Sequence, residues 1–420
     1  MPHLQDEPAS DGSWLPQPSA RGLWVAVIAI GSLYVGSTLL TPLYPLYERA
    51  FGFSELVVSE IYAAYVVGNL AVLFFFGRLS DQLGRRRTAL IALALTALSA
   101  LTFLVASSTT TLFVARMLNG FAAGLGAGTL TAWIAELEPR ADRSRASVLA
   151  SAGNLAGLSF GAVAGGLFAQ AAPWPLRSSY VFYLLLLTLV FALVRASPET
   201  LRNPVRSLRQ LALRPRLGIP PGLRRAFVAP AALAFACFAL GGFYAALAPG
   251  VLQQGLGRTN LALAGTIVGA FFGSAALTAA LSGRLTGRSA LPLSIAVLWV
   301  GLGLLVAAEA LRSLSLFLLA SLVAGVAVAL GYRSSLQMVN EMAPESRRAE
   351  LVSSYLLVCY CSNSLPVVGV GLLSRYTSAA LAHRVFAIAL GSLGVLAQIA
   401  ARWTRSERVE TRHRREPARA

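Results

Sequence analysis

The sequence contains few charged residues, and this scarcity excludes an ordinary soluble protein. Charged residues make up 13% of the 420-residue chain, whereas a soluble domain carries about 25%. Hydrophobic residues make up 56%, and lysine is absent, so all 35 basic residues are arginines. The net charge of +17 would indicate nucleic-acid binding if the arginines formed one patch. They lie instead between long apolar runs, so we expect no nucleic-acid partner.

Cysteine and histidine are also scarce, which leaves little material for a metal or redox centre. Cys359 and Cys361 are two positions apart in an apolar run and do not form a CxxC-type site. The remaining cysteine and the three histidines are Cys237, His3, His383 and His413. We place the histidines at the termini or in a loop, so we expect no metal site and no histidine proton relay inside a membrane. The chain lacks a Walker loop and an H-E-x-x-H pattern, so we expect neither an enzyme nor a cofactor.

Long apolar runs make up most of the chain. A bilayer core takes about 20 helical residues, and only helices and closed barrels satisfy the backbone polar groups in lipid. Continuous rather than alternating runs predict helices. The fold class is therefore an all-α membrane protein with twelve transmembrane helices. The expected spans are residues 24–46, 57–77, 88–107, 112–134, 146–170, 178–194, 226–247, 261–282, 291–308, 314–336, 351–373 and 384–402.

The arginines predict the direction of these spans. Most of them gather in loops and in a tail on the side that holds both termini. The arginines expected on the other side are Arg49, Arg177, Arg258, Arg312, Arg375 and Arg384. Because cytoplasmic loops carry the excess of positive charge, we predict a multi-pass protein of the plasma or inner membrane with both termini in the cytoplasm.

One connection, residues 196–225, differs from the short loops elsewhere. It is polar and arginine-rich and contains five prolines. It divides the chain into an N-terminal six-helix bundle (22–195) and a C-terminal six-helix bundle (226–402). The expected flanking segments are a disordered cytoplasmic N-terminal tail (1–21) and a basic cytoplasmic tail (403–420) that lies near anionic lipid.

The two halves carry traces of an internal repeat. The tripeptide Gly-Arg-Leu at 77–79 recurs at 283–285, and the dipeptide Leu-Phe at 112–113 recurs at 316–317. Pro139 and Pro344 follow corresponding spans, and the three offsets lie between 204 and 206 residues. The agreement of the offsets indicates a duplicated six-helix unit.

A short basic hairpin between the second and third spans is the most informative segment. It reads GRLSDQLGRRR over residues 77–87 and places one acid among four arginines. Its spacing, G-x-L-S-D-x-x-G-R-R, resembles the loop 2–3 signature of the major facilitator superfamily of transporters. The resemblance extends over the span region 24–402. It implies two pseudo-symmetric six-helix halves with a substrate site between them near the membrane midplane.

The same resemblance implies that the hairpin is a conformational switch. Gly77 and Gly84 permit close helix approach and a tight turn. Asp81 would bind the positive N-terminal end of the eleventh helix, around residues 349–352, in the outward-facing state. The second copy, residues 283–289, contains no acid. Asp81 is therefore a single-copy element of a duplicated protein.

The arginines of the hairpin have two possible roles. The resemblance implies that Arg85 or Arg86 pairs with an acid at the end of the fourth helix, and the candidates are Glu136 and Glu138. In the alternative interpretation, these arginines serve only as topology anchors. The sequence alone does not decide between an ion pair and an anchor.

One arginine lies inside a span and requires a partner there. Arg116 precedes Asn119 and Gly120, a segment that resembles the R-x-x-x-G motif of the family's fourth helix. An intramembrane arginine needs an acid, a carbonyl or a water-filled cavity. We interpret Arg116 and Asn119 as cavity residues that bind an anionic part of a substrate or tune a proton site. The alternative is an arginine that snorkels to the outer interface.

A stripe of glycines lies along one face of the fifth span. Gly157, Gly161 and Gly165 recur every four residues, a spacing that lets helices approach closely, so we predict a role in helix packing. The stripe also resembles the exporter-associated motif GxxxGPxxGG. Ala162 stands in place of the proline, which weakens the argument for export.

Polar residues are the remaining candidates for substrate contact in an otherwise apolar interior. They are Tyr34, Thr38, Asn69, Asn119, Asn154, Tyr244, Tyr332, Tyr360 and Asn363. Each is equally compatible with a hydrogen bond between helices. The deep interior contains no acid, so proton coupling would depend on an acid near one rim, with Glu60 and Glu136 as the best candidates. Facilitated diffusion stays open.

These features favour a secondary active transporter that works by alternating access. We favour a proton-linked exporter, an antiporter of drug-like or small metabolite compounds, because the expected cavity is apolar and aromatic. The alternative is an importer or facilitator of a sugar or organic anion. A third class is a non-transporting membrane receptor or a membrane-bound enzyme. The expected partners are a small-molecule substrate, protons if transport is coupled, and the lipid bilayer, and we expect a monomer.

Overall fold

The computed structural model describes residues 19–77, 79–201, 218–282, 287–344 and 347–415. Within these ranges the chain is helical and contains no β-strand, as the all-α fold class requires. Some sequence predictions concern residues outside these ranges. They include the tail before Ser19, Arg78 of the hairpin, the centre of the linker 196–225, residues 283–286 of the second loop and the last residues of the basic tail.

The helices coincide with the predicted spans, although several extend beyond them. The N-terminal half comprises α1 (Ala20–Leu39), η1 (Thr41–Leu43), α2 (Tyr44–Phe51), α3 (Glu55–Phe75), α4 (Leu79–Leu83), α5 (Arg85–Leu104), α6 (Thr109–Leu137), α7 (Arg143–Ala171) and α8 (Ser178–Arg195). The C-terminal half comprises η3 (Pro221–Leu223), α9 (Arg224–Ala246), α10 (Ala248–Gly250), η4 (Val251–Gly255), α11 (Leu261–Leu281), α12 (Gly287–Ala310), α13 (Leu314–Met342), α14 (Arg348–Tyr376) and α15 (Ala379–Arg415).

Eleven helices in the described part of the chain are long and apolar enough to cross a membrane. α6 is not among them, although it contains 29 residues. It carries Arg116, Asn119 and a series of glycines and threonines, which lower its mean hydropathy. The chain is a multi-pass membrane protein, and the count of twelve spans stays a prediction.

Polar residues just before the helices explain where several of them begin. A helix leaves its first N–H groups without partners, and a serine side chain can accept from one of them. The Ser108 hydroxyl accepts from the N–H of Thr111 at the start of α6. The Ser313 hydroxyl accepts from the N–H of Leu316 at the start of α13. The two caps occupy equivalent places in the two halves and add support to the internal repeat.

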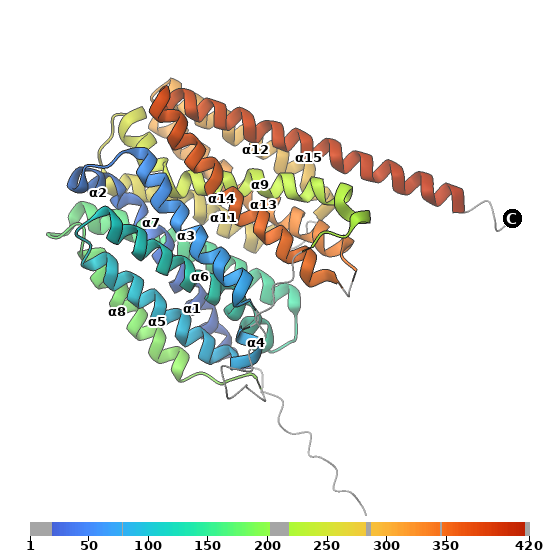
Figure 1. Cartoon of the computed structure of the whole chain (residues 1–420), viewed down its shortest axis with the longest axis horizontal. Coiled ribbons are helices and arrows are strands. Elements are labelled where there is room, and N and C mark those ends of the chain that lie inside the picture. Colours follow the sequence, from blue (N-terminus) through green and yellow to red (C-terminus); the bar gives the residue numbers. More distant parts are fainter. Residues whose placement is uncertain (1–18, 78, 202–217, 283–286, 345–346, 416–420) are drawn as a thin grey trace, which may run out of the picture.

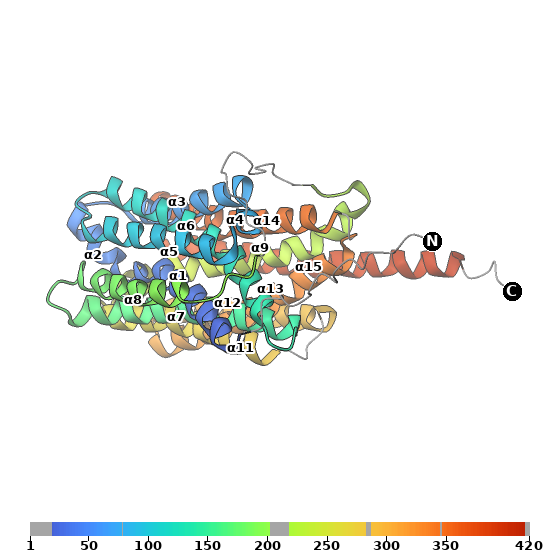
Figure 2. The same cartoon turned by 90° about the horizontal axis from the view of Figure 1, so that it is seen from below.

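The two halves form adjacent helical bundles with a long shared interface (Figure 1 and Figure 2). Within the N-terminal half α1 packs against α6 and α7, and within the C-terminal half α9 packs against α13, α14 and α15. Across the interface, α7 contacts α11 and α3 contacts α14. α4 and the extended end of α15 lie at one end of the molecule, here called the hairpin end (Figure 1). α2 lies at the opposite end, here called the α2 end.

The first predicted span, residues 24–46, is not one continuous helix. α1 ends at Leu39, and the chain continues through the 3-10 turn η1 into the short helix α2. Pro42 and Pro45 lack the N–H groups that a continuing α-helix requires, and each stands in the first turn of a new element. The break leaves Tyr44 and Tyr47 buried in the interior.

The prediction that His383 lies in a loop is wrong. α15 begins at Ala379, so His383 belongs to the start of that helix, and it is 1% exposed. The neighbouring Arg384 is exposed. In the sequence the charged Arg384 marks the start of the last apolar run, so the histidine before it falls outside the predicted span. In the structure the helix begins at Ala379, and its first turn directs His383 toward the interior.

Candidate functional site: a polar interior and a charged hairpin

Arg116 of α6 is a fully buried cation in the interior of the N-terminal half. Its Nη1 donates to the carbonyl oxygen of Ser37 at 2.8 Å, and its Nη2 donates to the hydroxyl of Tyr44 at 3.1 Å. Its guanidinium carbon lies 5.5 Å from the ring centroid of Tyr62 and 5.6 Å from that of Tyr65. Of the two interpretations of Arg116, the structure therefore contradicts snorkelling to the surface.

The contacts of Arg116 include no carboxylate in the described part of the chain. Its charge is stabilised by a carbonyl dipole, a phenol and two aromatic faces. Its Nε has no hydrogen-bond partner among the described residues, so one donor is unused. A buried charge without an ionic partner is costly. An anionic group that reached this site would offset that cost.

Tyrosine and asparagine side chains from both halves gather in the interior. The group consists of Tyr34, Tyr65, Asn69, Asn154, Tyr332 and Tyr360. Tyr34 of α1 lies beside Asn154 of α7 and near the three other phenols. Asn69 of α3 lies beside Tyr360 of α14, which belongs to the opposite half. The group, here called the tyrosine cluster, presents aromatic faces and neutral hydrogen-bonding groups at the interface between the halves.

Hydrogen bonds join the halves in the middle of the interface and toward the α2 end. The Thr41 hydroxyl donates to the carbonyl oxygen of Ala245 at 2.7 Å. The side-chain amide of Asn363 donates to the hydroxyl of Tyr62 at 2.9 Å. Asn363, one of the polar interior residues predicted from the sequence, thus contacts the opposite half. These bonds hold the halves together from the middle of the interface toward the α2 end.

Three other predicted interior residues contribute to packing within one half. The Thr38 hydroxyl donates to a backbone carbonyl of α7 at 2.6 Å. Asn119 accepts from the Ser37 hydroxyl at 3.4 Å. The ring of Tyr244 stacks on Phe271 with centroids 4.4 Å apart inside the C-terminal core. The structure does not bring Tyr244 together with the tyrosine cluster.

The glycine stripe of α7 packs directly on the backbone of α1. A β-carbon on Gly157, Gly161 or Gly165 would lie 2.1 to 2.3 Å from a carbonyl oxygen of α1. No side chain fits at these three positions without a shift of one helix. The stripe therefore serves close packing within the N-terminal half.

A second face of α7 meets α11 of the opposite half, again with little side-chain material between the backbones. A β-carbon on Gly166 would lie 2.6 Å from the carbonyl oxygen of Leu261, and one on Gly265 would lie 2.4 Å from the carbonyl oxygen of Ala162. α7 is thus the helix that joins the close packing of one half to the contact between the halves.

Arg85 is the centre of a charged network at the hairpin end. Its side chain lies 2.5 Å from Asp81 Oδ1, 2.9 Å from Glu136 Oε1 and 2.7 Å from the Ser80 hydroxyl. Glu138, the other candidate acid, pairs with Arg145 at 2.9 Å. Asp81 is therefore paired inside its own hairpin in this structure. None of its contacts in the described part of the chain reaches the start of α14.

A glutamate of the linker, Glu199, caps the helix that follows the hairpin. Its carboxylate accepts from the backbone N–H of Arg85 at 2.8 Å and from those of Arg86 and Arg87 at 3.4 Å each. Unpaired N–H groups and the helix dipole favour an anion at this position. Gly84, with φ of 104°, permits the contact because a β-carbon there would lie 2.5 Å from the carboxylate. The start of the linker is therefore tied to the hairpin.

Several of these residues are not among the candidates predicted from the sequence. Tyr62 and Tyr65 are three positions apart, a helical spacing that puts both on one face of α3 and could have identified them. Glu199 lies in an arginine-rich linker, where nothing in the sequence distinguishes it from a solvated acid. Glu60, which the sequence favours as a coupling acid, is exposed and lies apart from the interior group.

Comparison with known proteins places these features in a wider context. The sequence profile of the Major Facilitator Superfamily matches residues 26–365. The chain is 29% identical over 163 residues to the uncharacterized MFS-type transporter EfpA of Mycobacterium tuberculosis, a match that covers 38% of this chain and 30% of that protein. It is 27% identical over 177 residues to multidrug resistance protein D of Escherichia coli, covering 42% and 44%. It is 25% identical over 150 residues to quinolone resistance protein NorA of Staphylococcus aureus, covering 36% and 39%. The chain thus spans less than half the length of these relatives.

Proposed function

Because this chain belongs to the major facilitator superfamily, and is therefore a membrane transporter and not an enzyme, we propose that it exports drug-like or small metabolite compounds by alternating access. The observation that carries the proposal is the tyrosine cluster, which both halves share and which contains no acid. Aromatic faces with a few neutral polar groups suit apolar and amphipathic molecules. The names of two relatives refer to multidrug and quinolone resistance, which supports the same substrate class.

In the proposed cycle the hairpin end faces the cytoplasm, as the arginine distribution of the sequence requires. Both termini are then cytoplasmic, and the protein resides in the plasma or inner membrane. The hydrogen bonds from Thr41 and Asn363 close the α2 end, which becomes the outer end. Asp81 is engaged with Arg85 and not with the opposite half. Both observations support an inward-facing state, in which the interior is reached from the cytoplasm.

We further propose that the proton gradient drives export. The test is transport of a fluorescent lipophilic cation by purified protein in liposomes with an imposed pH gradient. The expected result is accumulation that follows the gradient and collapses when a protonophore is added. Absence of transport across a broad panel of lipophilic compounds would contradict drug export. Transport without dependence on the gradient would contradict proton coupling alone.

A second candidate function is facilitated transport of an organic anion, and one observation favours it. Arg116 is fully buried and has no carboxylate among its described contacts. A substrate carboxylate could supply the missing anion. The test is exchange of a labelled small carboxylate across liposomes. Saturable exchange in the wild-type protein that is lost in Arg116→Lys would support this candidate over drug export.

A further inference from the structure

A buried histidine lies close to the outer end of the interface, in a position that the proposed function does not use. Nδ1 of His383 on α15 lies 2.6 Å from Oε1 of Glu309 on α12, and the two side chains are 2% and 8% exposed. The ring of Phe243 meets the imidazole edge-on at 5.2 Å between centroids. The imidazole is thus held in one orientation by a carboxylate on one side and an aromatic ring on another.

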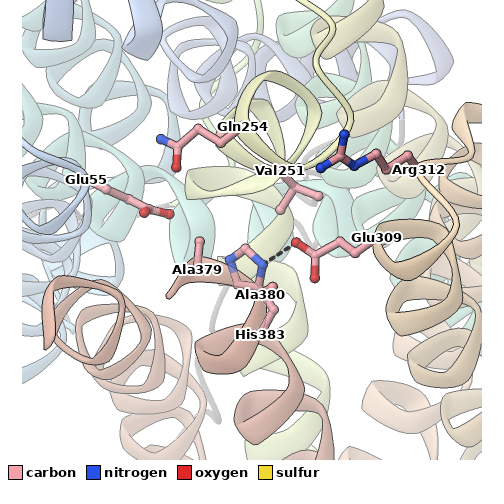
Figure 3. Close-up of a pocket in the computed structure, with 10 residues that line it drawn as sticks. Glu55, Val251, Gln254, Glu309, Arg312, Ala379, Ala380 and His383 are labelled. Atoms are coloured by element: carbon pink, nitrogen blue, oxygen red, sulfur yellow. Dashed lines mark hydrogen bonds and ion pairs between the residues drawn. The ribbon is translucent and has the colours of Figure 1, made fainter. Parts of the chain in front are cut away.

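The histidine lines a cavity that both halves enclose. The cavity measures about 320 Å³, and its ionisable lining groups are Glu55, Glu309, Arg312 and His383. Glu55 belongs to α3 of the N-terminal half, whereas the other three belong to the C-terminal half. Glu55 interacts electrostatically with both His383 and Glu309. Figure 3 shows the second ring nitrogen of His383 directed away from Glu309, toward the side of the cavity where Glu55 lies.

That second nitrogen, Nε2, is buried and has no hydrogen-bond partner among the described residues. When the neutral ring donates from Nδ1 to the Glu309 carboxylate, Nε2 is an acceptor whose lone pair receives no hydrogen bond from the described residues. A buried polar atom without a partner is costly. A proton on Nε2 gives the ring a positive charge, which the carboxylates of Glu309 and Glu55 favour electrostatically. No group of His, Cys, Asp and Glu suited to a metal ion occurs within the described ranges.

We propose that His383, Glu309 and Glu55 form a proton-binding site that holds the outer end of the transporter closed. The site is complete only when the halves meet, because Glu55 belongs to one half and the other two residues to the other. Opening the outer end separates Glu55 from the imidazolium and admits water. The closed state therefore binds the proton more tightly. By linkage, acid on the outer side favours closure, and alkaline conditions favour opening.

Other charged groups near the site contribute to its electrostatic potential. Arg312 lines the same cavity and stays protonated throughout the accessible pH range. On the neighbouring α2, Glu48 interacts with Glu55 and with Arg49, but it does not line the cavity. Glu48→Gln therefore tests whether a carboxylate beside the cavity, rather than one of the three residues of the site, carries the response to pH.

The inference rests on the alternating-access part of the proposed function and not on its substrate. Its test is the distance between two spin labels at the outer end, one on each half. Ala50 and Thr259 are exposed and uncharged, so both can be replaced by labelled cysteines. The labels are introduced into a variant in which the native Cys237, Cys359 and Cys361 are replaced by alanine. The distance distribution is measured in lipid nanodiscs between about pH 8 and about pH 5, the range in which histidine titrates.

The expected wild-type result is a shift from longer to shorter distances as the pH falls. His383→Gln keeps an N–H donor for Glu309 but cannot take up the proton, so its distribution should not respond to pH. Glu55→Gln should weaken the response, and Glu48→Gln should retain it. A wild-type distribution that is independent of pH, or an unchanged response in His383→Gln, overturns the proposal. A distance that responds to a transported compound but not to pH would overturn this site alone, whereas a distance that never changes would overturn alternating access as well.

Discussion

The hydroxyl of Thr41 donates to the carbonyl oxygen of Ala245 at 2.7 Å across a sequence separation of 204 residues. This separation equals the offset of the internal repeat within a residue or two. A residue and its copy can touch only close to the axis that relates the two halves. The bond therefore marks the place where the pseudo-symmetry axis leaves the bundle at the α2 end. It joins η1 of the first half to the end of α9 in the second.

Thr41→Val removes the hydroxyl and keeps the shape of the side chain. The buried carbonyl of Ala245 then loses its donor, which costs about 1 kcal/mol in the closed state. The population of the open outer end should rise about fivefold. The spin-label pair at positions 50 and 259 measures this shift. Thr102→Val is the control, because the exposed Thr102 hydroxyl bonds within its own helix at 2.8 Å. An equal shift in both variants would contradict the role of Thr41.

Arg116→Lys keeps the positive charge but loses the fork that reaches Ser37 and Tyr44 together. Charge-assisted hydrogen bonds contribute about 1.5 to 3 kcal/mol each, so we expect a loss of transport of about tenfold or more. The measurement is flux into liposomes at equal amounts of inserted protein. Arg177→Lys, at an exposed position between α7 and α8, should transport at the wild-type rate. Wild-type flux in Arg116→Lys would show that charge alone suffices.

Gly161→Ala places a β-carbon 2.3 Å from the carbonyl oxygen of Val35 and 2.6 Å from the Thr38 hydroxyl. Overpacking of this kind costs about 1 to 3 kcal/mol, so the melting temperature in detergent should fall by a few degrees. Gly128→Ala is the matched control on α6, where a β-carbon meets nothing within 4 Å. Since alanine is the better helix former by about 1 kcal/mol, that variant should be as stable as the wild type or more so. Equal melting temperatures in the two variants would refute the packing role of the stripe.

Asp81→Asn distinguishes two roles of Asp81: the ion pair with Arg85 seen in this structure, and the conformational switch that the family resemblance implies. In this structure the Asp81 side chain is 58% exposed, so its pair with Arg85 contributes less than about 1 kcal/mol and stability should hardly change. If Asp81 binds α14 in the outward-facing state, the variant should populate the outer-closed state more. Melting temperature and the spin-label distance measure the two effects. Asp142→Asn, at the start of α7, should leave the distance distribution as in the wild type. A wild-type distribution in Asp81→Asn would exclude the switch.

The architecture of the membrane region could be predicted from the sequence because lipid imposes strong constraints. A run of about 20 apolar residues has few alternatives to a helix, and the arginine-rich hairpin has few alternatives to a membrane surface. The break after α1 was encoded in Pro42 and Pro45, but it lies inside an apolar run, where hydropathy gives no boundary. The weak hydropathy of α6 reflects the residues that carry the interior chemistry.

The details of the candidate site were less accessible. Arg116 stands out in any apolar run, and the structure places it inside the bundle. A helix boundary drawn from the charge of Arg384 places His383 in a loop, because it ignores the inward face of the first turn of α15. Glu199 acts through its carboxylate on the backbone of α5, a contact that depends on how the linker folds back. Glu60 and Glu55 lie on the same helix, and only the packing of α3 decides which of them meets the opposite half.

The contact between α7 and α11 has a mechanical consequence. Backbones that meet without protruding side chains, as at Gly166 and Gly265, have no knobs to withdraw from holes when the angle between them changes. At these two positions a change in the angle between the helices meets no interlocked side chain, whereas elsewhere in the same contact Val163 packs against Gly269 and the Ser159 hydroxyl donates to the Gly269 carbonyl. The glycines at positions 166 and 265 thus leave room for α7 and α11 to move relative to each other. A bulky residue here would slow the turnover of the transporter even if every ligand contact were intact.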